Sequence, residues 1–443
     1  MNSYQLCNLH FNRSRKMVTV LLVVFVLGYL AITLEHSLNI NKSATALITA
    51  VLCWILIISN ASNKELVTEQ LSHHLSSISE IVFFLLGAMT IVEIIDAHDG
   101  FHSISESIKT TNKTKLIWLI AMITFFLSAI LDNLTSTIVM MFILNKLVED
   151  KKTKWMLLGL VIISSNAGGA WSPIGDVTTT MLWIGGQISP LNIIHQTFLA
   201  SFVSMVVPTL IINYLIKGKI ELKAYVEPNL NFNTNSFERN LIFYVGIGCL
   251  LFVPLFKSIT HLPPYMGMLL SLGIMWTITE LIHHKKLDKE KGSLSVSHAL
   301  RKIDTPSILF FFGILMSISA LEEIGALHDM ANTLNKNVGS INIVAICFGL
   351  LSTVFDNVPL VAALQSMYSL NEFPKDHYFW ELVALTAGTG GSCLIIGSAA
   401  GVAVMGMEKI DFFWYLKKIS WIALIGFIAG VCTFLIQHYL FEG

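Results

Sequence analysis

The sequence predicts an all-α polytopic membrane protein built from two inverted-topology repeats, each with a re-entrant hairpin and a broken transmembrane helix. Two observations predict this fold. The 443-residue chain is 54% hydrophobic and 13% charged, about half the usual share of charge in soluble domains. An aspartate–asparagine pair interrupts a long apolar stretch, and the same pair recurs in the second half of the chain. The net charge of −1 gives no basis for binding nucleic acid.

The first half, residues 17–216, follows an N-terminal tail of residues 1–16. Its apolar runs are long enough to cross a bilayer. They predict spans at 17–34, 43–59, 78–98 and 195–216. Residues 60–77 are predicted to be a separate polar segment, and residues 99–115 suit a helix at the membrane surface because they are too polar to span.

Residues 116–148 are predicted to form a re-entrant hairpin with Asp132 and Asn133 at its tip. The two arms each reach only about 22–24 Å at 1.5 Å per residue, short of a hydrocarbon core of about 30 Å. Lysines flank both ends of the stretch, which places both ends on one side of the membrane. An ionisable residue at membrane depth is costly and therefore indicates a functional site.

Residues 155–186 are predicted to form a broken helix, because the segment SSNAGGAWSPIGDVTTT lies inside it. Its glycines and proline cannot sustain a continuous helix. Backbone N–H and C=O groups without helical hydrogen bonds are tolerated at membrane depth only where they are buried within the protein or line a cavity. Helix packing is the alternative role for these glycines, but the neighbouring Asn166, Asp176, Thr178 and Thr179 argue against it.

After a linker loop at 217–239, the pattern begins again in a second repeat, residues 240–443. This half contains a hairpin at 341–370 with Asp356 and Asn357 at its tip. A broken helix at 380–406 carries GTGGSCLIIGSAAG. NAGGAWSPIG in the first half aligns with GTGGSCLIIG in the second, with the glycines in register, so the chain contains an internal duplication.

Each repeat crosses the membrane an odd number of times, so the second half is predicted to lie upside down relative to the first. Inverted repeats with interrupted helices are the architecture of secondary transporters. Placing the N-terminus outside puts most of the 28 Lys and Arg residues on the cytoplasmic side, including those in 285–302. Arg13, Arg15 and Lys16 in the N-terminal tail would then lie outside, contrary to the rule.

The polar residues of the hairpins and broken helices suit a sodium ion, which prefers hard oxygen ligands. Asp132, Asn133, Asp356 and Asn357 are predicted to bind Na⁺ at the midplane. The wider predicted set for ion binding and proton coupling adds Asn166, Asp176, Thr178, Thr179, Ser352, Ser392 and Ser398. A pair of aspartates can hold protons or a cation but not both at once, and such competition underlies cation/proton exchange.

Glu93, Asp96 and His98 form a second polar cluster at the end of the third span. A proton-relay or pH-sensing group is one interpretation, because histidine titrates near neutrality. An interfacial cluster that orients the adjacent helix is the other, and the sequence does not decide between them.

The motifs VEIIDAHDGF, LDN, SSNAGGAWSPIGDVTTTMLW and FDNVPL together resemble the NhaD-type sodium/proton antiporters of the ion-transporter superfamily. The resemblance covers nearly the whole chain beyond residue 16. It implies electrogenic exchange of Na⁺ or Li⁺ for H⁺ by an elevator-like movement, with Asp132 and Asp356 in proton/cation competition. It also implies a homodimer in the inner (plasma) membrane of a bacterium, with no cofactor beyond the transported ions.

The alternative is an oxyanion, arsenite or dicarboxylate permease of the same superfamily. Apart from Lys146 at the end of the first hairpin, no lysine or arginine lies inside the hairpin and broken-helix segments to clamp an anion, which disfavours this alternative. An intramembrane enzyme is also disfavoured, because no metal triad or Ser/His pairing appears at helical spacing. We therefore expect a transporter and not an enzyme.

Overall fold

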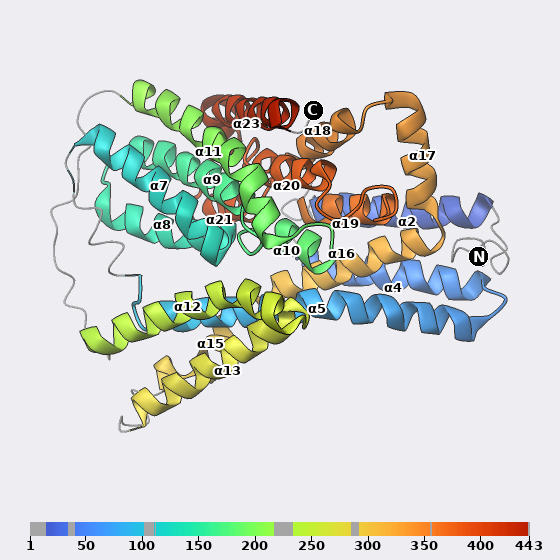
Figure 1. Ribbon diagram of the computed structural model, residues 1–443, viewed down its shortest axis with the longest axis horizontal. Helices are drawn as coiled ribbons and strands as arrows, with labels where there is room; N and C mark the ends of the chain where they lie inside the picture. Colours follow the sequence, from blue (N-terminus) through green and yellow to red (C-terminus); the bar gives the residue numbers. More distant parts are fainter. Residues whose placement is uncertain are drawn as a thin grey trace. The chain divides into compact units, whose positions relative to one another are not determined.

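Every regular element in the computed structural model is a helix throughout the residues that the structure describes (Figure 1). These residues are 15–33, 40–101, 110, 112–216, 234–284, 292–354 and 357–441. Within them, 8 segments are long and apolar enough to cross a membrane by length and composition. The prediction of an all-α polytopic membrane protein is confirmed.

The chain divides into two compact units, and each draws segments from both halves of the sequence. Unit 1 contains α2 (Arg15–Thr33), α4 (Lys42–Asn60), most of α5 (Lys64–Ala97), α16 (Thr305–Glu323), α17 (Ala326–Val338) and the last part of α19 (Asn357–Met367). Its centre is the packing of α16 against α4, where the indole of Trp54 donates to the carbonyl of Met316 at 2.9 Å. A Cβ added at Gly313 would lie 2.7 Å from the backbone of Ala46, so glycine permits this close approach.

Unit 2 contains the end of α5, nearly all of α18 (Ile341–Leu351), the start of α19 and thirteen further described elements. These are α7 (Lys113–Leu131), α8 (Asn133–Leu147), α9 (Lys151–Gly169), α10 (Val177–Ile184), α11 (Pro190–Leu215), α12 (Ser236–Thr260), α13 (Pro264–His283), α15 (Val296–Lys302), α20 (Tyr378–Gly390), α21 (Ala399–Glu408), α22 (Phe412–Tyr415) with the π-helix η1 (Leu416–Ser420), and α23 (Trp421–Phe441). Helices α11 and α23 lie side by side (Figure 1). Gly430 permits their close approach, because a Cβ added at this position would lie only 1.8 Å from Ser204 Oγ.

The hairpin segment of the first half consists of α7 and α8, which pack against each other and against α9. Helix α7 ends at Leu131 and α8 begins at Asn133, so the helical path breaks at Asp132. Helix α7 begins at Lys113, earlier than expected, because the side chain of Asn112 caps it. Its 19 residues are enough to place it among the candidate spans, so a re-entrant path stays a prediction.

A three-way polar contact joins the far end of α8 to α9 and α21. Lys154 Nζ donates to Asn145 Oδ1 at 2.7 Å and lies 3.1 Å from Glu408 Oε2. The amide of Asn145 donates in turn to Glu408 Oε1. The contact ties the second arm of the hairpin to both broken helices.

Two sequence expectations differ from the structure or fall outside it. The prediction of a separate polar segment at 60–77 is wrong from residue 64 onward, because α5 runs unbroken from Lys64 to Ala97. Serine hydroxyls in this segment bond to the helix's own carbonyls, as Ser72 Oγ does to Thr68 O at 2.9 Å, so these polar groups are satisfied within the helix. Most of the expected surface helix at 99–115 lies outside the described residues, as do the tail up to residue 14 and the linker residues 217–233.

Candidate functional site

Asp132 forms the turn between α7 and α8 and caps α8. Its backbone has φ 84° and ψ 164°, a region that glycine enters freely and other residues rarely. The carboxylate accepts hydrogen bonds from the backbone N–H of Thr135 at 2.7 Å and from its hydroxyl at 3.0 Å. The half-buried side chain therefore places negative charge at the positive end of α8.

Five buried side chains from five elements form a hydrogen-bonded group that we call the Asn–Asp cluster. They are Asn133, Asn166, Asp176, Asn357 and Ser398. Asn133 Nδ2 donates to Asp176 Oδ2 at 2.6 Å and to Asn166 Oδ1 at 3.0 Å. Asn166 Nδ2 donates to Ser398 Oγ at 3.0 Å, and Asn357 Nδ2 lies 3.4 Å from each oxygen of Asp176. The cluster thus joins the residue that follows each predicted hairpin tip to both broken helices.

Asp176 is the carboxylate of the cluster and the N-cap of α10. Its Oδ1 accepts from the backbone N–H and the hydroxyl of Thr178, each at 2.8 Å. The hydroxyl of Thr179 donates to the carbonyl of Asp176 at 2.9 Å. Asp176 is 1% exposed, and its charge lies against the N-terminus of α10. Of the two predicted threonines, Thr178 contacts the carboxylate and Thr179 the backbone.

The predicted residues of the second half divide between the cluster and the helix breaks. Ser398 caps α21 within the cluster, whereas Ser352 donates to the carbonyls of Gly349 at 2.7 Å and Ala387 at 3.2 Å. Ser392 donates to the Thr389 carbonyl at 2.6 Å, at the break between α20 and α21. Asp356 lies outside the described residues, so its predicted closeness to Asp132 stays a prediction.

Matched contacts recur at the two hairpin segments. A Cβ added at Gly168 would lie 2.2 Å from the carbonyl oxygen of Phe125, and one at Gly390 would lie 2.0 Å from that of Gly349. In each sequence half the glycine belongs to the broken helix, and its neighbour lies seven residues before the predicted tip aspartate. These distances support the internal duplication; the inverted orientation of the repeats stays a prediction.

Serine hydrogen bonds and capping residues repeat in the same way. Ser128 Oγ donates to the Ser165 carbonyl at 2.6 Å, as Ser352 does to the Ala387 carbonyl. Asp176 and Ser398 both cap the second part of a broken helix from extended backbone, with φ −147° and −144°. The carboxylate at the first position has only a hydroxyl as its counterpart, so the charge of the cluster is asymmetric.

The electrostatics of the site favour a cation. Lysine and arginine are absent from 116–145, 155–216, 337–374 and 376–408. A helix N-terminus binds anions readily, but the N-termini of α8 and α10 already carry the carboxylates of Asp132 and Asp176. The C-terminal ends of α9 and α20 at the breaks present carbonyl oxygens, which suit a positive charge.

The three residues of the predicted proton relay make different contacts. Glu93 Oε1 lies 3.3 Å from Lys302 Nζ, and Asp96 is exposed. His98 is fully buried, with Nδ1 2.7 Å from the Ile94 carbonyl and Nε2 2.7 Å from Nε2 of His283. The rings of the two histidines are stacked, with centroids 5.0 Å apart. Glu93 and Asp96 lie close enough to interact electrostatically, whereas His98 pairs with His283. Relay or pH sensing stays a prediction.

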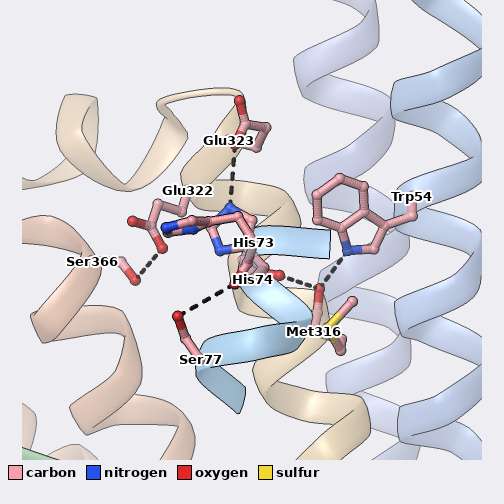
Figure 2. A network of polar contacts seen from close by, with 9 residues as sticks. Trp54, His73, His74, Ser77, Met316, Glu322, Glu323 and Ser366 are labelled. Atoms are coloured by element: carbon pink, nitrogen blue, oxygen red, sulfur yellow. Dashed lines mark hydrogen bonds and ion pairs between the residues drawn. The ribbon is translucent and has the colours of Figure 1, made fainter. Parts of the chain in front are cut away.

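A separate acidic and histidine network lies within unit 1 (Figure 2). His74 Nε2 lies 3.2 Å from Glu323 Oε2, and Ser366 Oγ donates to Glu322 Oε2 at 2.9 Å. These two glutamates occupy the position in the second half that the Glu93 segment occupies in the first. The network connects α5, α16 and α19 inside this unit.

Sequence reasoning missed two buried groups of unit 2. Tyr415 is fully buried, and its hydroxyl donates to the Ser392 carbonyl at 2.8 Å, at the break between α20 and α21. Glu381 in α20 is 1% exposed and accepts a hydrogen bond from Asn192 Nδ2. The rule that selected Asp132, a carboxylate inside an apolar stretch, would also have found Glu381.

The apolar helices, the paired helix breaks and the buried oxygen cluster define a multi-pass membrane transporter. A sequence profile described as citrate transporter matches residues 22–390. The chain is 48% identical over 419 residues to sodium/proton antiporter 1 of Arabidopsis thaliana, covering 94% of this chain and 72% of that protein. Sodium/proton antiporter 2 of the same plant is also 48% identical, over 94% of this chain and 99% of its own length.

Bacterial relatives carry the name of the family that the motifs resemble. The Na(+)/H(+) antiporter NhaD of Alkalimonas amylolytica is 30% identical over 447 residues, covering 94% of this chain and 90% of the relative. The chain belongs to the NhaD-type sodium/proton antiporter family, within the broader family described as citrate transporter. Its relatives are transporters, so the expectation that it is not an enzyme is confirmed.

Proposed function

We propose that the chain exchanges Na⁺ or Li⁺ for H⁺ across the membrane. One observation carries the proposal: the carboxylates of Asp132 and Asp176 occupy the N-termini of α8 and α10, where an anionic substrate would otherwise bind. Negative charge there attracts a cation and repels an anion. The names of the plant and bacterial relatives support the same substrate.

The proposed binding site combines the Asn–Asp cluster with Asp132 and Asp356. Asparagine side chains carry both a donor and an acceptor, so rotation of an amide exchanges Nδ2 for Oδ1 beside a cation. Asn133 and Asn357 both lie against Asp176 and can turn an oxygen toward the ion. Protons and Na⁺ compete for the same carboxylates, which couples the two movements.

The elevator-like movement is part of the same proposal. Gly168 and Gly390 bring each broken helix into backbone contact with the preceding hairpin segment. Packing this close leaves no room for sliding between them, which supports movement of each pair as one body. The inverted repeats then provide the two alternating access states.

A citrate, dicarboxylate or arsenite permease is the second candidate, because the matching sequence profile is described as citrate transporter. An anion would need a cationic partner or a free helix N-terminus. The basic residues are missing from the segments around the site, and both carboxylate caps oppose it. The geometry therefore favours the cation.

Proton movement in everted membrane vesicles tests the proposal. A pH-gradient dye is quenched by respiration, and NaCl, LiCl, KCl, citrate or arsenite is added in turn. We expect NaCl or LiCl to restore the fluorescence in vesicles that contain the protein and not in vesicles without it. A response to citrate or arsenite, with none to Na⁺ or Li⁺ from pH 7 to 9.5, would establish the second candidate instead.

The membrane and the oligomeric state stay predictions from the sequence. The named relatives come from a plant and from bacteria, so their sources do not select between a bacterial plasma membrane and another membrane. The homodimer is tested by measuring the size of the protein in detergent and by chemical cross-linking in the bilayer.

A further inference from the structure

Tyr415 is a buried tyrosine that contacts the second helix break and that the proposed cation site does not include. It is the last residue of α22, it is fully buried, and its hydroxyl donates to the carbonyl of Ser392 at 2.8 Å. Ser392 lies in the loop between α20 and α21. Backbone carbonyls at such breaks are the groups that transporters with interrupted helices turn toward a cation. Tyr415 therefore restrains backbone of the kind that binds the transported ion.

A π-helical turn follows Tyr415 and packs on the first broken helix. The π-helix η1 begins directly after Tyr415. Its Ile419 lies against α9, because a Cβ added at Gly159 would lie 2.5 Å from Ile419 Cδ1. π-helical turns are rare and frequently occur at functional sites. The segment from Tyr415 to Ile419 thus contacts both broken helices, one through a hydroxyl and the other through an apolar side chain.

The loops at the two breaks fold back in the same way. A Cβ added at Gly169 would lie 3.1 Å from Asp176 Cβ, and one added at Gly391 would lie 3.1 Å from Ser398 Cβ. Asp176 and Ser398 cap the second part of each broken helix and belong to the Asn–Asp cluster. The conformation of each loop therefore sets where its cluster residue lies.

A hydroxyl from a later helix reaches the equivalent carbonyl in each loop. Ala170 of the first half aligns with Ser392 of the second, and each directly follows the glycine that contacts the cap. The hydroxyl of Thr197 on α11 lies 3.5 Å from the Ala170 carbonyl, as that of Tyr415 lies 2.8 Å from the Ser392 carbonyl. Thr197 and Tyr415 differ in type and do not occupy aligned positions. What recurs is the contact itself, which indicates that the loop carbonyl needs to be held.

Holding these carbonyls restricts the spacing of the oxygen atoms around the proposed cation. In each half the held carbonyl lies six residues before the cap, within one short loop. Alkali cations carry the same charge and differ chiefly in size. Discrimination between ions of equal charge depends on the size and the flexibility of the site. A loop that is held in place therefore favours one ion size more strongly than a loop that can open.

We propose that the hydroxyls of Tyr415 and Thr197 are positioning groups that set the selectivity of the exchange among Li⁺, Na⁺ and K⁺. Each holds the carbonyl of one break loop and thereby keeps the cap residue of that loop, Asp176 or Ser398, at a fixed place in the cluster. This inference rests on the proposed function. The structural alternative is that both hydroxyls only stabilise the packing of α11 and α22 on the broken helices.

Transport by the purified protein in proteoliposomes separates these roles. Half-saturating concentrations and maximal rates are measured with Li⁺, Na⁺ and K⁺. Tyr415→Phe keeps the ring and removes the hydroxyl. We expect the ratio of the Li⁺ to the Na⁺ half-saturating concentration to rise about threefold or more, because a lost hydrogen bond lets the loop open toward the larger ion. The maximal rate with Na⁺ stays within about twofold of the wild type. A purely stabilising hydroxyl would lower the melting temperature and leave the ratio unchanged.

Thr197→Val tests the first loop, with Thr209→Val as its matched control. Thr197 and Thr209 are both fully buried on α11, and their hydroxyls bond back to the carbonyls of Ile193 and Met205. Thr197 also reaches the break loop, so we expect Thr197→Val to shift the ratio in the same direction as Tyr415→Phe, by less because its contact is longer. Thr209→Val, and Tyr439→Phe at a tyrosine that is 79% exposed, are expected to leave the ratio unchanged.

An unchanged ratio in Tyr415→Phe overturns the inference, as does an equal shift in Thr209→Val. If Tyr415→Phe fails to insert, Thr197→Val decides by the same criterion. Thr197→Ser keeps the hydroxyl and is expected to retain the wild-type ratio, so an equal shift in Thr197→Ser and Thr197→Val also overturns the inference. The proposed function fails separately, and the inference with it, if the wild type moves protons in response to neither Na⁺ nor Li⁺.

Discussion

At the scale of single residues, Asp132 combines an unfavourable backbone conformation with a charge in an apolar stretch. The conformation costs on the order of 1–3 kcal/mol for a residue other than glycine. The carboxylate offsets part of this by capping α8 through Thr135. A residue kept under these conditions is best explained by a function that needs its carboxylate.

Asp132→Asn and Asp132→Gly separate that function from stability. Both substitutions remove the charge, so we expect both to abolish Na⁺-dependent proton movement while the protein stays in the membrane. Glycine also relaxes the backbone by about 1–3 kcal/mol, whereas losing the cap to glycine costs only a few tenths. The melting temperature of Asp132→Gly in detergent is therefore expected to equal or exceed that of the wild type. Wild-type apparent Na⁺ affinity in either variant would remove Asp132 from the site.

Asp356→Asn tests the second hairpin by the same transport assay. The sequence repeat places Asp356 at the tip that corresponds to Asp132. We expect this substitution to abolish exchange as well, because the proposed competition needs both carboxylates. Retention of wild-type Na⁺ affinity would assign the site to Asp132 and Asp176 of the first half.

At the scale of elements, the sequence located the helix breaks well and the links between them poorly. Asp132 and the glycines at 168–175 mark breaks because their local conformation or chemistry opposes a helix. The contact of Asn357 with Asp176 joins residues far apart in the chain, and no local pattern encodes such a contact. The polarity of Lys64–Ser77 did not predict the continuity of α5, because polar residues are compatible with a helix.

Gly168→Ala and Gly390→Ala test the paired hairpin contacts. Each new Cβ would meet a backbone carbonyl oxygen, at 2.2 Å from Phe125 O and 2.0 Å from Gly349 O. Overpacking of this kind costs about 1–3 kcal/mol, so we expect a lower melting temperature and slower exchange in both variants. Gly273→Ala is the control, because an added Cβ there meets nothing within 4 Å. Equal melting of all three variants would contradict the close backbone packing.

The contact among Lys154, Asn145 and Glu408 gives a second test at this scale. We expect Lys154→Met and Glu408→Gln each to lower stability, with a coupling of about 0.5–3 kcal/mol in a double-mutant cycle. The charge-exchanged protein Lys154→Glu/Glu408→Lys is expected to recover part of the loss. Additive single effects would show that the ends of α9 and α21 are not tied by this pair.

At the scale of the whole molecule, the predicted inversion places corresponding segments on opposite sides of the membrane. The positive-inside rule puts the ends of the first hairpin, near Asn112 and Asp150, in the cytoplasm. The ends of the second, near Gly339 and Glu372, then lie outside. Single cysteines at these positions in a cysteine-free protein are expected to react with an impermeant reagent from opposite sides. Labelling of all four from one side would rule out the inverted repeat.

The central claim is that Na⁺ and H⁺ compete for carboxylates at one site. The most direct test is the apparent Na⁺ affinity of the wild type in proteoliposomes, measured between pH 5 and pH 9. Competition with one proton predicts that the half-saturating Na⁺ concentration rises about tenfold for each unit by which the pH falls below the site's titration range. A half-saturating concentration that does not change across this range would contradict the account.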